Sequence, residues 1–92
     1  MRYLKEKQMA RLYRDGDGAG HYGCVTESID PDTLEVVGTE PEVGRMFKVG
    51  TMTASTYGNR DWWRTTPVTE IIRDNEYEVR FRTRNSIYTF ER

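Results

Sequence analysis

The clearest pattern in the chain is an alternation of apolar and charged residues between positions 76 and 84. An apolar residue or a threonine occupies every second position: Tyr77, Val79, Phe81 and Thr83. The positions between them are charged: Glu78, Arg80, Arg82 and Arg84. Because successive side chains of a strand point to opposite faces, this period of two predicts a strand with one buried face and one face in water.

Shorter patterns on both sides of this strand predict its neighbours. Residues 68–73 and 87–91 are also rich in β-branched and aromatic residues, which favour strands. The dipeptides Asp74-Asn75 and Asn85-Ser86 join them to the central strand, and Asn and Asp tolerate the left-handed backbone that tight turns need. The C-terminal third is therefore predicted to be a three-stranded antiparallel meander.

The first half of the chain shows weaker alternation. It predicts four short strands, at residues 9–14, 21–29, 34–37 and 45–53. Segments rich in Gly, Pro and Asp separate them and predict turns, at residues 15–20, 30–32 and 41–44. Residues 1–14 also fit a short amphipathic helix, in which Met9, Leu12 and Tyr13 share one face, although a strand over 9–14 is favoured.

Six or seven short strands in 92 residues predict one small domain, residues 1–92. The expected fold class is mainly β, a small antiparallel sheet bent into a partly open barrel of SH3-like or OB-like size, with room for one short N-terminal helix. The chain is 36% hydrophobic and 12% aromatic. In a chain this short, that composition supports one core and leaves little room for a deep catalytic cavity.

The formal net charge of −1 hides three blocks of opposite sign. Residues 1–14 hold five basic residues and one acidic, residues 15–42 hold eight acidic and no basic, and residues 43–92 hold nine basic and six acidic. Proteins that bind bulk duplex DNA are usually basic overall, so a pI near 5.8 disfavours that function. A local basic stripe can still hold one phosphate-bearing ligand. Alternatively, the three blocks neutralise one another in the fold.

The sequence also indicates the cellular compartment in which the protein is expected to act. No uncharged apolar run approaches the roughly 20 residues of a membrane span, so we expect no membrane partner. Met1 to Lys5 begin with a charge and no apolar stretch follows, so we expect no secretory signal. The single cysteine, Cys24, excludes an internal disulfide and fits a reducing compartment. We therefore expect a cytoplasmic protein in which Cys24 is a small buried residue.

Three motifs resemble catalytic or metal-binding signatures but lack essential parts. Residues 18–23 spell G-x-G-x-x-G, yet the following segment predicts a strand where a dinucleotide site needs a helix. Residues 15–20 match the first half of a calcium loop, but Thr26 stands where a bidentate Glu is needed. His21 and Cys24 are too few ligands for zinc and would face opposite sides of a strand. We expect no metal, no cofactor and no enzymatic activity.

The adjacent Trp62, Trp63 and Arg64 form the first candidate binding segment. Two neighbouring tryptophans cannot face the same way on a strand, so we expect at least one near the surface. Trp and Arg are enriched among interface hot spots and stack well on bases. The alternative is that one indole belongs to the core and the other packs against residues 65–67.

Arg80, Arg82 and Arg84 form the second candidate, a stripe about 7 Å apart along one strand face. Arginine suits bidentate contacts with phosphate or carboxylate groups. Like charges in a row repel, so an external anion or acidic protein is one way to balance them. The alternative is a solvated face whose charges pair with Glu70, Asp74 or Glu78.

Two segments carry a resemblance to known proteins. The first runs Asp-Trp-Trp-Arg-Thr-Thr-Pro-Val-Thr-Glu-Ile from Asp61, and the second runs Phe-Arg-Thr-Arg-Asn-Ser-Ile-Tyr-Thr-Phe from Phe81. Together they resemble the C-terminal half of small uncharacterised proteins of bacteriophages and prophages, over about residues 57–91. The resemblance implies a phage accessory protein in the host-cell cytoplasm. Such proteins often antagonise host defence, as anti-CRISPR proteins or as sponges for signalling nucleotides.

These observations predict a phage-type accessory binding protein that antagonises a host defence factor by direct binding. The expected partner is a host protein or a nucleotide signal. Two alternatives remain open: a nucleic-acid-binding regulatory protein, and a phage structural or assembly protein. A homodimer is also open, because small open sheets leave edges that can pair.

Overall fold

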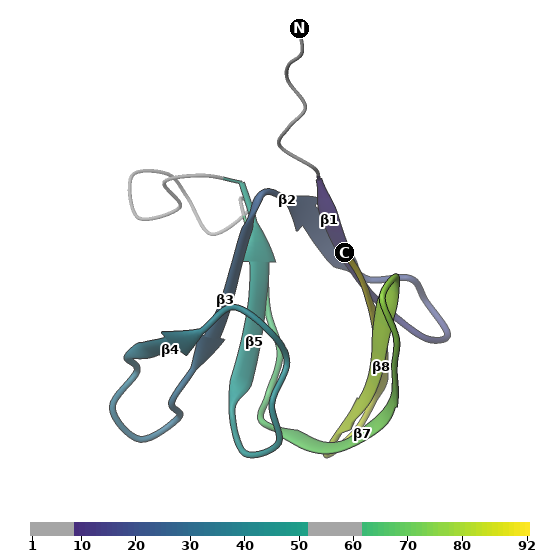
Figure 1. Cartoon of the computed structure of the whole chain (residues 1–92). Coiled ribbons are helices and arrows are strands. Elements are labelled where there is room, and N and C mark those ends of the chain that lie inside the picture. The colour runs from purple at the N-terminus through teal and green to yellow at the C-terminus, as the bar shows by residue number, and fades with distance from the viewer. Residues whose placement is uncertain (1–8, 52–61) are drawn as a thin grey trace, which may run out of the picture.

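The computed structural model describes residues 9–51 and 62–92, and these ranges form nine strands and no helix (Figure 1). The expected mainly β fold is confirmed. Of the alternatives for the first 14 residues, the strand over 9–14 is confirmed as β1 (Ala10–Arg14), and a helix is wrong for these five residues. Residues 1–8 and 52–61 lie outside the described residues.

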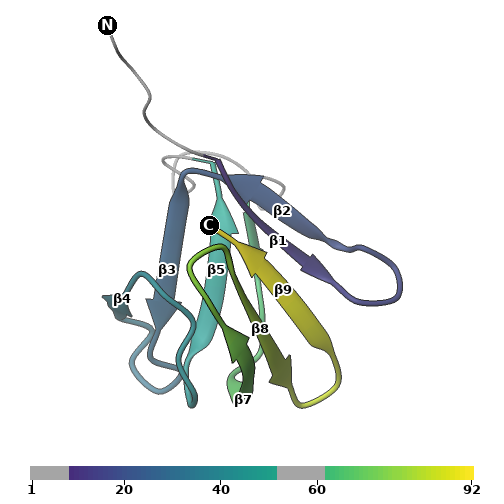
Figure 2. The same cartoon turned by 45° about the vertical axis from the view of Figure 1, so that its right-hand side comes forward.

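One sheet has five strands in the order β2-β1-β9-β8-β7, all antiparallel (Figure 2). It contains the predicted meander: β7 (Val68–Asp74), β8 (Glu78–Thr83) and β9 (Ile87–Glu91). The first turn of the meander is longer than expected, because Asn75 Oδ1 accepts hydrogen bonds from the backbone N–H groups of Tyr77 and Glu78. Tyr77 therefore belongs to the turn and is 74% exposed, which corrects its assignment to the buried face.

The second sheet has four strands in the order β4-β3-β5-β6, also antiparallel. Its members are β4 (Val36–Gly38), β3 (Val25–Ile29), β5 (Met46–Gly50) and β6 (Trp62–Arg64). The two sheets are not closed into a barrel. The expected open arrangement therefore takes the form of two separate sheets that share one core.

The chain crosses between the sheets at Gly23 and Cys24. Residues 21–29 were expected to form one strand, but they divide into β2 (Gly20–Gly23) and β3, which belong to different sheets. Gly23 allows the crossing because its backbone lies against β5: a Cβ added to it would stand 1.8 Å from the carbonyl oxygen of Gly50. Cys24, at the corner itself, is exposed, so the expectation that it is buried is wrong.

A cluster of aromatic rings joins the two sheets. Phe47 of β5 is fully buried and meets Phe90 of β9 edge-on, with ring centroids 4.7 Å apart. Phe47 also meets Phe81 of β8 edge-on at 6.2 Å. Buried aromatic residues dominate core energetics, and edge-to-face pairs add about 0.5–1.5 kcal/mol each. The other buried members of this core are Ala10, Leu12, Val49, Val68, Val79 and Tyr88.

Strand β7 bends strongly around one side of the core (Figure 1). Its register against β8 shifts twice, between Val68 and Glu70 and between Ile71 and Arg73. Such bulges add an unpaired residue and increase local bending. At the start of β7, Val68 forms a parallel bridge with Val43, in the segment that joins β4 to β5 of the second sheet.

Candidate recognition surface

The two tryptophans of β6 lie on opposite faces of the four-stranded sheet. Trp63 pairs with Val49 and Trp62 pairs with Gly50 of the neighbouring strand β5. Trp63 packs against the buried cluster, so its face is the inner one. Trp62 therefore lies on the outer face, and the expectation that the two indoles separate is confirmed. Both side chains are half-buried.

Trp63 is positioned by contacts between the two sheets. Its Nε1 donates a hydrogen bond to the hydroxyl of Tyr88 on β9, at 3.3 Å. The guanidinium carbon of Arg14 on β1 lies 5.3 Å from the Trp63 ring centroid, within cation–π range. These contacts give Trp63 a packing role, as one of the two interpretations anticipated, and its part in binding stays a prediction.

Arg14 is in turn fixed by the glycine-rich loop that follows β1. Its Nε and Nη2 donate to the two carboxylate oxygens of Asp17, at 3.1 and 2.7 Å. This hydrogen bonding, together with a hydrogen bond from the backbone N–H of Ala19, lowers the pKa of Asp17 to about 2. The same pairing raises the pKa of Arg14 above its ordinary value. The Asp17 carboxylate of this loop thus forms a structural ion pair with Arg14.

Trp62 stands on the outer face beside two cations. The Nζ of Lys48 lies 5.4 Å from the Trp62 ring centroid, and the guanidinium carbon of Arg64 lies 5.7 Å from it. Lys48 also pairs with Glu27 of β3, with Nζ 3.0 Å from Oε1. Arg64 has no carboxylate within ion-pair distance in the part of the chain that the structure describes. We call Trp62, Arg64 and Lys48 the Trp62 surface.

The arginine stripe lies on the outer face of the other sheet, and most of its charge is matched there. Arg80 pairs with Asp15 of the glycine-rich loop and also donates to Thr89 Oγ1 at 3.2 Å. Arg82 Nε donates to Glu70 Oε1 on β7 at 3.1 Å. Cross-strand pairing, one of the two interpretations of the stripe, therefore accounts for Arg82, and the loop carboxylate accounts for Arg80.

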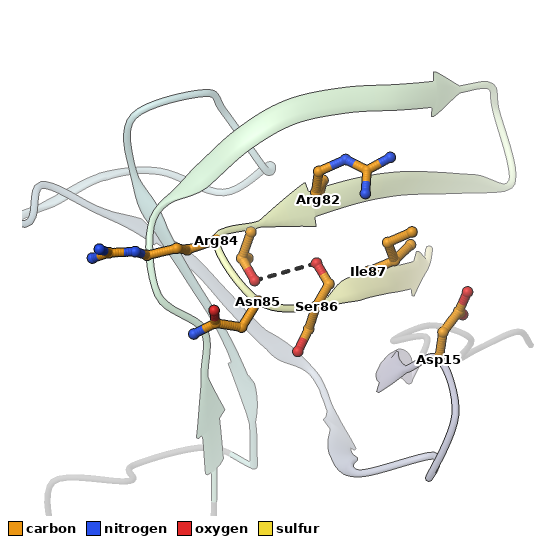
Figure 3. Close-up of a pocket in the computed structure, with 7 residues that line it drawn as sticks. Asp15, Arg82, Arg84, Asn85, Ser86 and Ile87 are labelled. Atoms are coloured by element: carbon orange, nitrogen blue, oxygen red, sulfur yellow. Dashed lines mark hydrogen bonds between the residues drawn. The ribbon is translucent and has the colours of Figure 1, made fainter.

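Arg84 lies apart from this network, in the turn between β8 and β9. The turn borders a shallow pocket of about 370 Å³, whose lining residues are Asp15, Arg82, Thr83, Arg84, Asn85, Ser86 and Ile87. In Figure 3 the Arg84 side chain points away from Arg82 and Asp15. Within the described ranges Arg84 has no ion-pair partner. The three arginines therefore do not converge on one ligand position.

The structure thus divides the six expected binding residues among three places. It brings Trp62 and Arg64 together, places Trp63 between the sheets, and leaves Arg80, Arg82 and Arg84 on the other sheet. Sequence reasoning missed Lys48, which joins Trp62 only because β5 pairs with β6. The alternating pattern of β5 marks Lys48 as outward-facing, but nothing local in the sequence identifies its neighbour strand.

Within residues 9–51 and 62–92, no three His, Cys, Asp or Glu side chains gather closely enough to hold a metal ion. The same ranges include no helix long and apolar enough to cross a membrane.

Comparison of the chain with family models, with curated proteins and with solved structures gives no match. The resemblance over residues 57–91, and the function drawn from it, therefore stay predictions.

Proposed function

We propose that this chain is a binding protein that recognises its partner through the Trp62 surface. In the setting that the resemblance implies, it is a phage accessory protein that antagonises a host defence factor by occupying it. The factor is a defence protein or its nucleotide signal. The observation that carries the proposal is a half-buried indole on an outer sheet face, flanked by two cations.

The chemistry of this surface favours a partner that offers a flat or apolar group next to a negative charge. Trp and Arg are the residues most enriched among interface hot spots. Cations beside the ring hold the indole in one orientation, so less side-chain entropy is lost when a partner binds. Arg64 is exposed and lacks a carboxylate among the described residues, which leaves its guanidinium available for a phosphate or carboxylate.

The test is phage growth on a panel of host strains, each carrying one defence system, with this chain expressed in the host. We expect the wild-type chain to restore plaque formation on at least one strain, and Trp62→Ala to abolish that rescue. Tyr22→Ala is the matched control, because Tyr22 is an exposed aromatic residue on the edge strand β2 of the other sheet. Circular dichroism and thermal melts check that both variants fold.

Two outcomes would overturn the proposal. One is that the wild-type chain rescues growth on none of the strains. The other is that a folded Trp62→Ala variant rescues growth as well as the wild type does.

A second candidate function is a nucleic-acid-binding regulator, and the same surface favours it. An aromatic ring on which a base stacks, beside cations that contact the backbone, is the usual arrangement in single-strand binders. Affinity for a labelled single-stranded oligonucleotide that falls steeply with salt, and that Trp62→Ala removes, would support this function over protein recognition.

A further inference from the structure

The acidic block between residues 15 and 42 is mostly neutralised in the fold. Five of its eight carboxylates form ion pairs: Asp15–Arg80, Asp17–Arg14, Glu27–Lys48, Glu40–Arg92 and Glu42–Arg45. The other three, Asp30, Asp32 and Glu35, have no cation within ion-pair distance among the described residues. All three lie in the turn that joins β3 to β4, so the uncompensated charge is concentrated at one place.

The same hairpin exposes apolar side chains. Leu34 is 62% exposed, Val36 is 54% exposed and Val37 is 42% exposed. In Figure 1 this hairpin projects from the body of the molecule, at the edge of the four-stranded sheet. We call residues 30–37 the acidic hairpin. A patch of exposed apolar side chains rimmed by charge is typical of an interaction site.

Hydrogen bonds hold the turn in one shape. The backbone N–H of Leu34 donates to the carbonyl oxygen of Asp30 at 2.8 Å, and the N–H of Asp30 donates to the carbonyl oxygen of Glu35 at 2.9 Å. The Asp30 carboxylate accepts from the N–H of Asp32 at 2.8 Å. Leu34 is thereby presented outward on a defined turn, with Asp32 and Glu35 on either side in the sequence.

We infer that the acidic hairpin docks into a partner protein whose contact surface is an apolar depression rimmed by Lys and Arg. Charge complementarity selects this partner, because three carboxylates without cations repel nucleic acid and acidic surfaces and attract basic ones. The apolar side chains supply the central contact, and the carboxylates supply the charged rim. This inference does not depend on the Trp62 surface, which lies at the opposite edge of the same sheet.

The geometry of the edge favours docking by side chains over addition of a partner strand. The register of β4 against β3 shifts between Ser28 and Ile29, so β4 carries one extra residue. A bulge of this kind in a strand of three residues disrupts the regular row of backbone groups that an added strand would need.

The test uses two synthetic amphipathic peptides as probes, one of leucine and lysine and one of leucine and glutamate, titrated into the intact isotopically labelled chain. We expect the lysine peptide to shift the NMR signals of Leu34, Val36 and Val37, and the glutamate peptide to leave them unchanged. Leu34→Asn and the double variant Asp32→Asn, Glu35→Gln should each weaken binding of the lysine peptide about tenfold.

Control variants separate this inference from the proposed function. Tyr77→Ser removes a similarly exposed side chain from the turn of another hairpin, and Trp62→Ala removes the indole of the Trp62 surface. Both should bind the lysine peptide as the wild type does. Loss of binding in Trp62→Ala, shifts that avoid the acidic hairpin, or unchanged affinity in folded Leu34→Asn and in the double variant would each overturn the inference.

Discussion

The outer faces of the two sheets differ in how their charges are matched. On the five-stranded sheet, four arginines each face a carboxylate: Arg11–Glu91, Arg73–Glu78, Arg80–Asp15 and Arg82–Glu70. On the four-stranded sheet, Lys48 pairs with Glu27, while Arg64 and the acidic hairpin have no opposite charge nearby within the described ranges. Exposed ion pairs stabilise a fold by about 0–1 kcal/mol each. Folding therefore hardly requires such matching. Arg84, in the turn between β8 and β9, is also unpaired within the described ranges, but on the four-stranded sheet the unpaired charges lie beside Trp62 and beside exposed apolar side chains, and a partner can use both.

Gly23→Ala should disrupt the close packing of the corner at Gly23 against β5, and we expect it to lower the stability more than any other variant proposed here. The new Cβ would stand 1.8 Å from the carbonyl oxygen and 2.2 Å from the carbonyl carbon of Gly50, so one backbone must move. We expect the free energy of unfolding to fall by more than about 3 kcal/mol, a large share of the total for a domain of this size. Urea denaturation followed by circular dichroism measures it.

Gly38→Ala is the control for this variant. A Cβ at Gly38 would lie 3.6 Å from Ser28 Cβ and 3.7 Å from Glu42 Oε2, which are ordinary contacts. Its stability should stay within about 0.5 kcal/mol of the wild type. Equal losses in the two variants would contradict the close approach of Gly23 to β5.

The two tryptophans test whether the inner face of the four-stranded sheet contributes more to stability than its outer face. Trp63→Ala should lower the free energy of unfolding by about 2–3 kcal/mol, less than the 3–5 kcal/mol typical of a fully buried aromatic residue, because Trp63 is half-buried. Trp62→Ala should cost less than about 1 kcal/mol, since it removes contacts on the outer face only. Thermal and urea denaturation of both variants, side by side, measure the difference. The reverse order of losses would mean that Trp62 and not Trp63 belongs to the core.

Substitutions at Leu34 test whether the backbone conformation of this residue, in the acidic hairpin, is unfavourable for a leucine. Its φ angle is 64°, in the left-handed region, which is unfavourable for a leucine. Leu34→Asn should raise the free energy of unfolding by about 1 kcal/mol, because Asn tolerates this conformation. Leu34→Val should lower it, since β-branched residues fit this region worst. Thermal melts that rank the two variants in the opposite order would refute this account.

The smallest effect concerns the acid titration of the glycine-rich loop. The pKa of Asp17 is lowered from 3.8 to about 2, first by the hydrogen bonds from Arg14. A depressed folded-state pKa contributes stability that is complete above about pH 4 and is lost as the pH falls through about 2. Carbon-detected NMR should place the Asp17 midpoint near pH 2, and Arg14→Gln should move it back toward 3.8. An unchanged midpoint in that variant would contradict the role of Arg14.

The alternation of apolar and polar residues was sufficient to predict those parts of the fold that are determined by residues close together in the sequence. The alternation around Phe81 predicted β8 and its place in the meander, because a period of two shows directly which face is buried. The same rule predicted that Trp62 and Trp63 separate. It failed at Tyr77, where the side chain of Asn75 extends the turn by bonding the following backbone.

The other misses share one cause, which is contact between segments far apart in the sequence. The corner at Gly23 and Cys24 depends on the backbone of Gly50 lying close by, and no local pattern reports that. The partner of Arg80, Asp15, is 65 residues away in the sequence. Sequence alone indicated that the arginine stripe needed balancing charge, but it could not distinguish an internal carboxylate from an external ligand.

The strand order of the smaller sheet has one more consequence. With β4 and β6 at its two edges, the acidic hairpin and Trp62 are separated by three strand spacings, or about 14 Å, across the sheet. They also lie at opposite ends of the strands, because Val36 is level with Ile29 and Met46 whereas Trp62 is level with Val25 and Gly50, which adds about 13 Å along the strands. Backbone hydrogen bonds fix that separation, so a partner that engages both ends must match it. Once one end of the sheet has bound such a partner, the fixed span holds the other end close to its own site on that partner, at a high effective concentration. Binding through both ends is therefore tighter than binding through either end alone.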